Sequence, residues 1–156
     1  EEQAEAALEG LRAAALERWH FRMINDLPRS SQYEGAIASA VASLQGQRCG
    51  GGGGSGITAL DIGTGTGLLA LMCARLPGVA HVHACEMSDV LADVAREVVA
   101  ASGPRLREAV TVHGVISTEL ELPRKVDLVF CEIFDAGLLG EHVLPTLLHA
   151  RKALLR

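Results

Sequence analysis

The chain has 156 residues, a formal net charge of −5 at pH 7, and a hydrophobic share of 49%. This length fits one domain with a sizeable core, and the aromatic share of only 3% predicts a mainly aliphatic core. The mildly acidic balance argues against a nucleic-acid partner held by a basic surface. The apolar runs are far shorter than the roughly 20 residues of a membrane span, so we expect no membrane partner either.

The cysteines and histidines of the chain show no spacing typical of metal ligands. None of the four cysteines forms a C-x-x-C pair, so we expect no metal ion. Cys73, Cys85 and Cys131 lie in apolar stretches, which indicates buried free thiols in a reducing compartment. The expected location is therefore the cytoplasm, the nucleus or both.

The first third of the chain is predicted to be a helical lead-in, residues 1–46, followed by a flexible glycine-rich loop, residues 47–56. Residues 1–18 are rich in Ala, Glu, Leu and Arg, which favours a helix. Residues 50–56 are all glycine except for one serine, a composition typical of a flexible surface loop.

Pro28 marks a predicted helix boundary inside this lead-in. A helix is expected to stop near this proline. Ser30 or Ser31 is then expected to cap the next helix, with Glu34 near the offset of a capping box.

From residue 57 onward, short apolar strands alternate with helices. The predicted strands are 57–62, 80–85, 109–113 and 126–131. The predicted helices are 68–76, one from 88 or 89 to 101, and one from about 138 or 141 to 155. Such alternation predicts an α/β fold, a Rossmann-like parallel sheet with helices on both faces. A further strand would be needed to cover the edge of the fourth strand. We therefore expect residues 57–156 to be a core truncated before its last strands, and the chain of residues 1–156 to be marginally stable alone.

Glycines at alternate positions, Gly63, Gly65 and Gly67, form a turn after the first strand. They leave the backbone open to a ligand and permit φ values that other residues avoid, which predicts a nucleotide-type cradle. The spacing is one residue tighter than the dinucleotide fingerprint G-x-G-x-x-G. This glycine pattern, preceded by Leu60-Asp61-Ile62, resembles motif I of the S-adenosylmethionine (AdoMet) methyltransferases. Asp61 would orient the turn or hold the amino group of the ligand.

Two further positions follow strand ends. Glu86 ends the second strand, where a carboxylate can accept hydrogen bonds from both ribose hydroxyls of a nucleoside. The alternative is a solvent-facing glutamate. Ile116 and Ser117 follow the third strand, where an adenine edge would lie.

Two glutamates, Glu132 and Glu141, flank a turn that contains Gly137 and Gly140. A hairpin of this length can bring the carboxylates together, and they would repel each other unless a cation lay between them. A planar guanidinium fits well, because each acid can accept paired N–H donors. The alternative is two unrelated acids, one at a strand end and one at a helix N-terminus.

Together these motifs resemble the protein arginine N-methyltransferases, over roughly residues 19–155. Residues 60–67 resemble the family's motif I, and Glu86 resembles its ribose-binding acid. Glu132 and Glu141 resemble its double-glutamate loop. The resemblance implies a class I AdoMet-methyltransferase fold.

The lead-in carries a fourth part of the resemblance. His20, Met23, Asp26 and Arg29 match the spacing of the family's His-x-x-Met-x-x-Asp-x-x-Arg helix, which closes over AdoMet. Residues 134–138 look most like the atypical branch of arginine methyltransferases 7 and 9, with 9 nearer. The commoner members have Trp-Met-Gly-Tyr in this loop, so the product type stays open.

The resemblance implies a role for each matched residue. Arg29 would pair with the AdoMet carboxylate, and Met23 would pack near the methyl donor. Glu132 and Glu141 would hold the substrate guanidinium while its nitrogen attacks the methyl carbon of AdoMet and displaces S-adenosylhomocysteine (AdoHcy). In the family, the counterpart of Asp26 pairs with a histidine of a Thr-His-Trp loop.

The resemblance also implies partners. The substrate would be an arginine-containing protein, such as a histone or an RNA-binding protein, and the parent protein would be a dimer or pseudo-dimer. Because the Thr-His-Trp loop and the β-barrel substrate domain are not in this sequence, we expect little methylation by this chain alone. Two alternatives stay open: another AdoMet methyltransferase, acting on a small molecule or another residue, and a non-catalytic AdoMet-binding scaffold.

Overall fold

The computed structural model describes residues 22–48, 56–134 and 142–156. The helices are α3 (Leu27–Arg48), α4 (Leu68–Arg75), α5 (Asp89–Ala101), α6 (Pro104–Ala109), α7 (Val143–His149) and the π-helical turn η1 (Ala150–Leu154). The strands are β1 (Ile57–Ile62), β2 (Val79–Cys85), β3 (Val110–His113) and β4 (Leu128–Cys131). Much of the predicted lead-in and most of the glycine-rich loop lie outside the described residues, so those boundaries stay predictions.

The four strands form one parallel sheet in the order β3-β2-β1-β4. β1 lies inside the sheet, and its residues Ala59 and Leu60 are fully buried, as expected for an apolar strand covered on both faces. The predicted α/β fold with a parallel sheet is confirmed. Because the strands are parallel, the loops that follow them meet at one edge of the sheet, where ligands of such folds bind.

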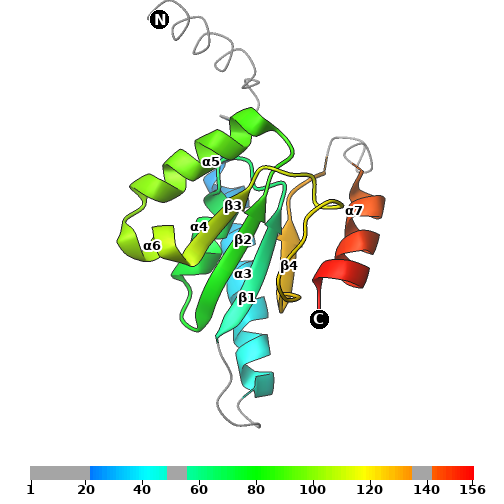
Figure 1. Ribbon diagram of the computed structural model, residues 1–156. Coiled ribbons are helices and arrows are strands. Elements are labelled where there is room, and N and C mark those ends of the chain that lie inside the picture. Colours follow the sequence, from blue (N-terminus) through cyan, green and yellow to red (C-terminus); the bar gives the residue numbers. More distant parts are fainter. Residues whose placement is uncertain (1–21, 49–55, 135–141) are drawn as a thin grey trace, which may run out of the picture.

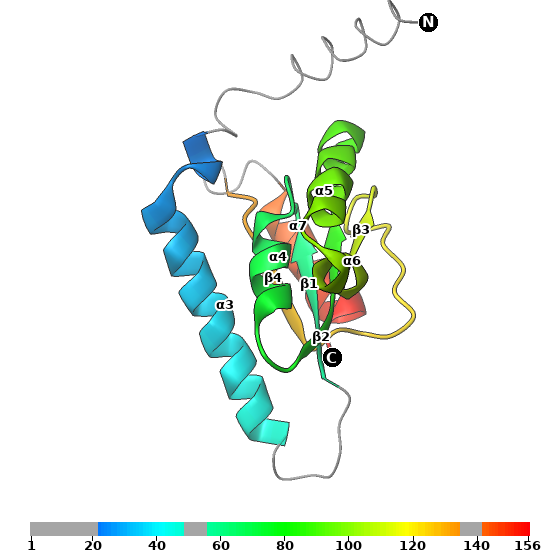
Figure 2. The same ribbon diagram turned by 90° about the vertical axis from the view of Figure 1, so that its left-hand side faces the viewer.

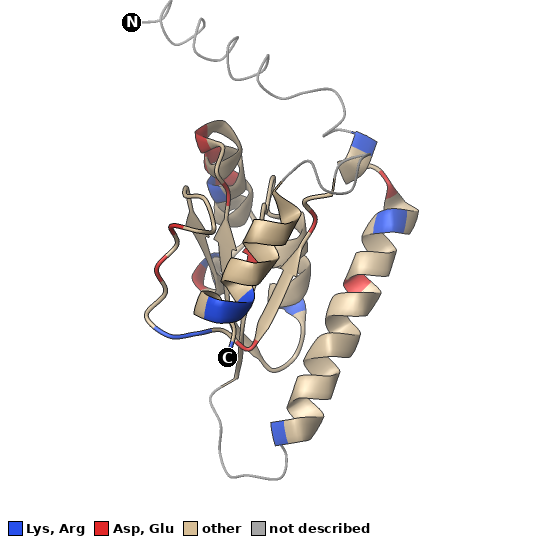
Figure 3. Cartoon of the chain, turned by 90° about the vertical axis from the view of Figure 1, so that its right-hand side faces the viewer, with Lys and Arg blue, Asp and Glu red and all other residues tan. Residues whose placement is uncertain are grey.

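Helices cover both faces of the sheet. In Figures 1 and 2, α3 and α4 lie on one face and α7 lies on the other. One apolar cluster joins Ile37 of α3 and Ala70 of α4 to the sheet, and a second joins Leu60 to Leu154 of η1. The charged residues of α3 are Arg29, Glu34 and Arg48. Most of this helix is accordingly tan in Figure 3.

The start of α3 differs from the predicted one. Residues 22–24 are helical, and α3 begins at Leu27, so Pro28 lies in its first turn, where a missing N–H is not needed. The cap predicted at Ser30 or Ser31 was wrong. Asp26 caps α3 instead, because its Oδ1 accepts a hydrogen bond from the backbone N–H of Arg29 at 3.1 Å.

Two later helices also differ from prediction. α6, which was not predicted, begins at Pro104 directly after Gly103, whose φ is 92°. Within the described residues the last helix starts at Val143, and its second half, η1, is π-helical. The helices that were predicted at 68–76 and 88–101 are confirmed to within one residue at each end.

No described helix has both the length and the apolar character that crossing a bilayer requires.

Asp127, just before β4, joins segments at the edge of the sheet opposite the glycine turn. Its side chain is only 4% exposed and forms ion pairs with Arg48 and, at 2.9 Å, with Nη1 of Arg156. It also accepts hydrogen bonds from the backbone N–H and the hydroxyl of Thr58, at 2.8 and 3.0 Å. A buried carboxylate is tolerated when it is paired in this way, so Asp127 is expected to stabilise the fold.

We expect Asp127→Ala to lower the free energy of unfolding by about 2–3 kcal/mol, because it removes four contacts from a buried group. Asp93→Ala is the matched control, since Asp93 pairs with Arg96 at 2.7 Å on the surface. An exposed pair contributes under about 1 kcal/mol. Urea unfolding of both variants measures the difference, and equal losses would contradict the role given to Asp127.

Candidate functional site

A cavity of about 590 Å³ opens at the carboxyl edge of the sheet. Residues 63–66, 86–88, 115–117 and 132–133, which follow the four strands, all contribute to its lining. Residues from the start of α3 and from α7 complete it. The fold therefore collects the motifs after β1, β2, β3 and β4 around one space, as the parallel topology predicts.

The glycine turn is held close to its neighbours. Gly63, Gly65 and Gly67 have φ values of 71°, 56° and 84°, a region that favours glycine. A Cβ on Gly63 would lie 2.5 Å from Cγ2 of Ile133, whereas a Cβ on Gly65 would meet nothing within 4 Å. Gly63 is therefore required for packing, and Gly65 leaves space beside the cavity that it lines.

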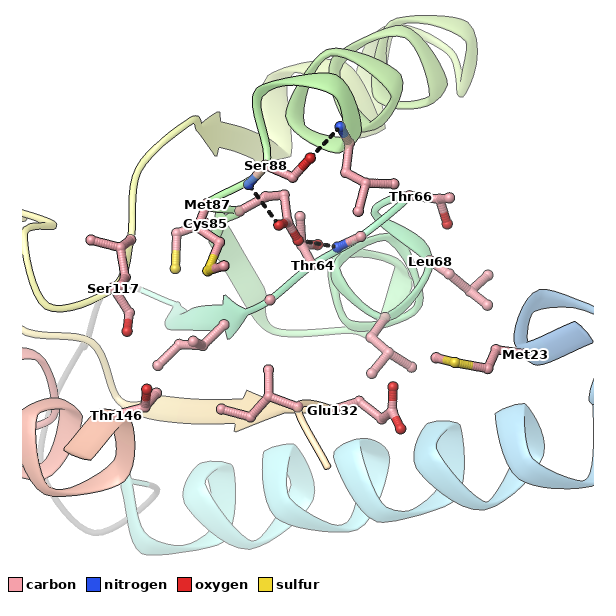
Figure 4. A pocket seen from close by; sticks show the side chains of 18 of the residues that line it. Met23, Thr64, Thr66, Leu68, Cys85, Met87, Ser88, Ser117, Glu132 and Thr146 are labelled. Atoms are coloured by element: carbon pink, nitrogen blue, oxygen red, sulfur yellow. Dashed lines mark hydrogen bonds between the residues drawn. The ribbon is translucent and has the colours of Figure 1, made fainter. Parts of the chain in front are cut away.

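Glu86 connects the glycine turn to the loop after β2. Its side chain is buried, with Oε2 accepting from the Gly65 N–H at 3.0 Å and Oε1 from the Ser88 N–H at 2.9 Å, the dashed lines at the centre of Figure 4. Each carboxylate oxygen has a second lone pair. Glu86 can thus hold the two loops and still accept hydrogen bonds from a ligand.

Asp61 lies beneath the turn and is not among the residues that line the cavity. It is fully buried, and its Oδ2 accepts a hydrogen bond from the Thr64 hydroxyl at 2.6 Å. Burial raises its pKa to about 7; the Thr64 hydrogen bond opposes the shift, and the charges of Glu86 and Glu132 add to it. The Thr64 contact agrees with a role in orienting the turn, and ligand contact stays a prediction.

The raised pKa of Asp61 has a consequence for stability. Because the folded-state pKa lies above the ordinary 3.8, folding favours the neutral carboxyl. The stabilising contribution of Asp61 to the free energy of unfolding is fully present below about pH 4, and it is lost as the pH rises to about 7. We expect Asp61→Asn to gain up to about 4 kcal/mol relative to wild type between about pH 4 and pH 8. Urea unfolding across this range measures the gain, and a difference that does not vary with pH would contradict it.

One end of the cavity carries a charged pair. Glu132, at the end of β4, forms an ion pair with Arg29 of α3, and Met23 lies beside Glu132 in Figure 4. Arg29 also reaches the backbone oxygen of Met23 at 3.5 Å. Three residues that the resemblance assigned to the cofactor and the substrate therefore lie together, although they come from opposite ends of the sequence.

Three other predicted site residues are not part of this group. His20 and Glu141 lie outside the described residues, so the convergence of Glu132 and Glu141 stays a prediction. Asp26 is exposed, caps α3 and is not among the lining residues. Its predicted role with a histidine stays untested.

Two uncharged polar side chains lie at the other end of the cavity. Ser117 and Thr146 lie there, away from Met23 and Glu132, in Figure 4. Both are buried, whereas Ile116 is 38% exposed while lining the cavity. Ser117 and Ile116 were predicted to line the site, but Thr146 was not. Its only sequence signal is that it is a polar residue inside the apolar stretch of α7.

No three His, Cys, Asp or Glu side chains in residues 22–48, 56–134 and 142–156 form a group that could hold a metal ion.

The sequence is similar to those of arginine methyltransferases. Residues 59–156 match the family described as "Methyltransferase domain". An arginine N(omega)-methyltransferase of Streptomyces achromogenes subsp. streptozoticus is 40% identical over 143 residues, 89% of this chain and 36% of that protein. Protein arginine N-methyltransferase 9 of Mus musculus is 38% identical over 144 residues, 90% of this chain and 15% of that protein. The chain thus spans about a third or less of these relatives.

Solved structures of arginine methyltransferases are also similar to this fold. The PRMT1 enzyme-prozyme heterotetrameric complex of Trypanosoma brucei with AdoHcy has a TM-score of 0.73 at 29% identity, covering 89% of this chain and 39% of that chain. Protein arginine methyltransferase 10 of Arabidopsis thaliana has the same TM-score and identity, and the match covers 93% of this chain and 38% of that chain. The chain therefore belongs to the methyltransferase-domain family, and the proteins and structures that it is similar to include arginine N-methyltransferases.

Proposed function

We propose that this chain binds AdoMet in the cavity and serves the transfer of its methyl group to an arginine guanidinium of a protein substrate. The observation that carries the proposal is the ion pair of Arg29 and Glu132 at one end of the cavity. Glu132 already accepts a guanidinium there, which is the chemical group that the proposed substrate presents.

The residues of the cavity fit AdoMet. Glu86 would accept hydrogen bonds from the ribose hydroxyls, for which it has free lone pairs, and the open side of Gly65 leaves room for a ligand. Ile116 and Ser117 would lie toward the adenine, and Arg29 toward the carboxylate. Bound AdoMet supplies a methyl group on a positively charged sulfur.

The chemistry proposed for the protein is positioning and electrostatic stabilisation. Glu132, together with Glu141, would hold the guanidinium and concentrate its positive charge away from the reacting nitrogen. That nitrogen would be held in position to bond the methyl carbon as the carbon–sulfur bond breaks, and it would pass its proton to a carboxylate of the site or to water. Met23 would pack beside the reacting groups, and we propose that His20 and Asp26 belong to the same site.

Features of the whole protein are part of the proposal as well. The relatives are about two and a half times the length of this chain or longer, so we propose that substrate docking and full activity require further domains. The Trypanosoma brucei neighbour is a heterotetrameric complex, which supports a dimer or larger assembly. Free cysteines, among them Cys73 and Cys85, support a reducing compartment, the cytoplasm or nucleus.

Labelled methyl transfer tests the function. The protein as its gene encodes it is incubated with methyl-labelled AdoMet and an arginine-rich protein, and the hydrolysed product is resolved into its amino acids. Label on methylarginine is the expected result. Label on another residue or on a small molecule would overturn the arginine assignment, and failure to bind AdoHcy in calorimetry would overturn the cofactor assignment.

A further inference from the structure

Ser30 carries a buried hydroxyl that the fold leaves without a hydrogen-bond partner. Ser30 is 6% exposed, lies on α3 beside Arg29, and lines the cavity. Among the described residues, its Oγ makes no hydrogen bond. The hydroxyl is the only polar group of a serine side chain, so the Ser30 side chain makes no hydrogen bond with the described residues.

Other serines on helices of this chain behave differently. The hydroxyl of Ser39, also on α3, donates to the backbone oxygen of Gly35 at 2.9 Å. The hydroxyl of Ser102, at the end of α5, donates to the backbone oxygen of Val98 at 2.7 Å. Both use the carbonyl four residues earlier, which is the usual local partner of a helical serine. Ser30 does not use the corresponding carbonyl, that of Asp26, which accepts only the backbone N–H of Ser30, at 2.9 Å, among the described residues.

An unpaired buried hydroxyl is unfavourable, and a polar ligand would remove the penalty. Arg29 lines the same cavity and pairs there with the carboxylate of Glu132. A serine hydroxyl can donate or accept, whereas a guanidinium can only donate, so a ligand group that reaches both residues would be an anionic oxygen group rather than a cation.

We propose that the Ser30 hydroxyl donates a hydrogen bond to the carboxylate at the amino-acid end of AdoMet, beside Arg29. This inference rests on the proposed AdoMet site and adds a residue to it that the motif spacings did not single out. Ser30 then acts as a ligand-binding residue that distinguishes AdoMet from adenosine compounds that lack the carboxylate.

The test compares Ser30→Ala with Ser30→Thr, which keeps a hydroxyl, and with Ser39→Ala as the matched control on the same helix. Calorimetry gives the Kd of each protein for AdoMet and for decarboxylated AdoMet, which keeps the amino group. We expect Ser30→Ala to weaken AdoMet binding about tenfold and to leave the Kd for decarboxylated AdoMet within about twofold. Ser30→Thr and Ser39→Ala should bind AdoMet within about threefold of wild type.

The melting temperature separates a binding role from a packing role. Because the hydroxyl has no partner in the fold, Ser30→Ala should melt at or above the wild-type temperature. An unchanged Kd for AdoMet, equal weakening for both ligands, or a lowered melting temperature without rescue by threonine would each overturn the inference. A wild-type chain that binds neither ligand would instead overturn the proposed function itself.

Discussion

Glu132→Gln is expected to lower the rate of methyl transfer to arginine by about 100- to 1000-fold, while changing the Kd for AdoMet less than about tenfold. The substitution keeps the size of the side chain but removes the negative charge that would hold the substrate guanidinium. The amide oxygen can still accept a hydrogen bond from Arg29, so the cavity end should keep its shape. Single-turnover assays with labelled AdoMet measure the rate, and calorimetry measures the Kd.

Glu34→Gln is the control for this experiment. Glu34 is an exposed acid on α3, so the substitution makes the same change in charge outside the cavity, and we expect a rate within about twofold of wild type. A Glu132→Gln protein that transfers methyl groups at the wild-type rate would contradict the role of Glu132. So would a loss that is explained entirely by weaker AdoMet binding.

The parts of the fold that could be predicted are those set by local sequence. The apolar run of β1 and the glycines after it identify a buried strand and a tight turn, because each needs those residue types at those positions. Ser88 was one of two predicted starts of its helix, and its side chain does cap α5, accepting from the Leu91 N–H at 3.4 Å. The alternation of strands and helices predicts a parallel sheet, in which the loops that follow the strands lie at the same edge.

The cap of α3 shows where local reasoning fails. Asp26 and Ser30 are both good caps by residue type, and each precedes a stretch that can be helical. The prediction took Pro28 as the end of a helix and therefore placed the cap after it. A proline is equally common in the first turn of a helix, which is where Pro28 lies. The difference concerns the site as well, since Ser30 lies inside α3, which starts at Leu27, and lines the cavity.

Contacts between distant residues could not be predicted from spacing. The resemblance assigned Arg29 to the cofactor and Glu132 to the substrate, whereas the structure pairs the two directly. That pair depends on how α3 lies against β4. Thr146 was missed for the same reason: its place in the lining depends on how α7 packs on the sheet.

Glu86→Ala is expected to weaken AdoHcy binding at least about 100-fold. Two hydrogen bonds to the ribose hydroxyls would be lost, each about 1.5 kcal/mol for a charged acceptor. The backbone N–H groups of Gly65 and Ser88 would also lose their acceptor, so the glycine turn should become less ordered. We therefore expect a second effect, a loss of about 1–2 kcal/mol in the free energy of unfolding.

A ligand lacking the ribose hydroxyls separates these two effects. Wild type should bind adenosine more tightly than 2′,3′-dideoxyadenosine by about 10-fold or more, because only adenosine can donate to Glu86. Glu86→Ala should bind the two compounds equally, whatever the state of its glycine turn. If the variant still prefers adenosine by the wild-type ratio, Glu86 does not contact the ribose. Its burial between Gly65 and Ser88 would then serve only to hold the two loops together.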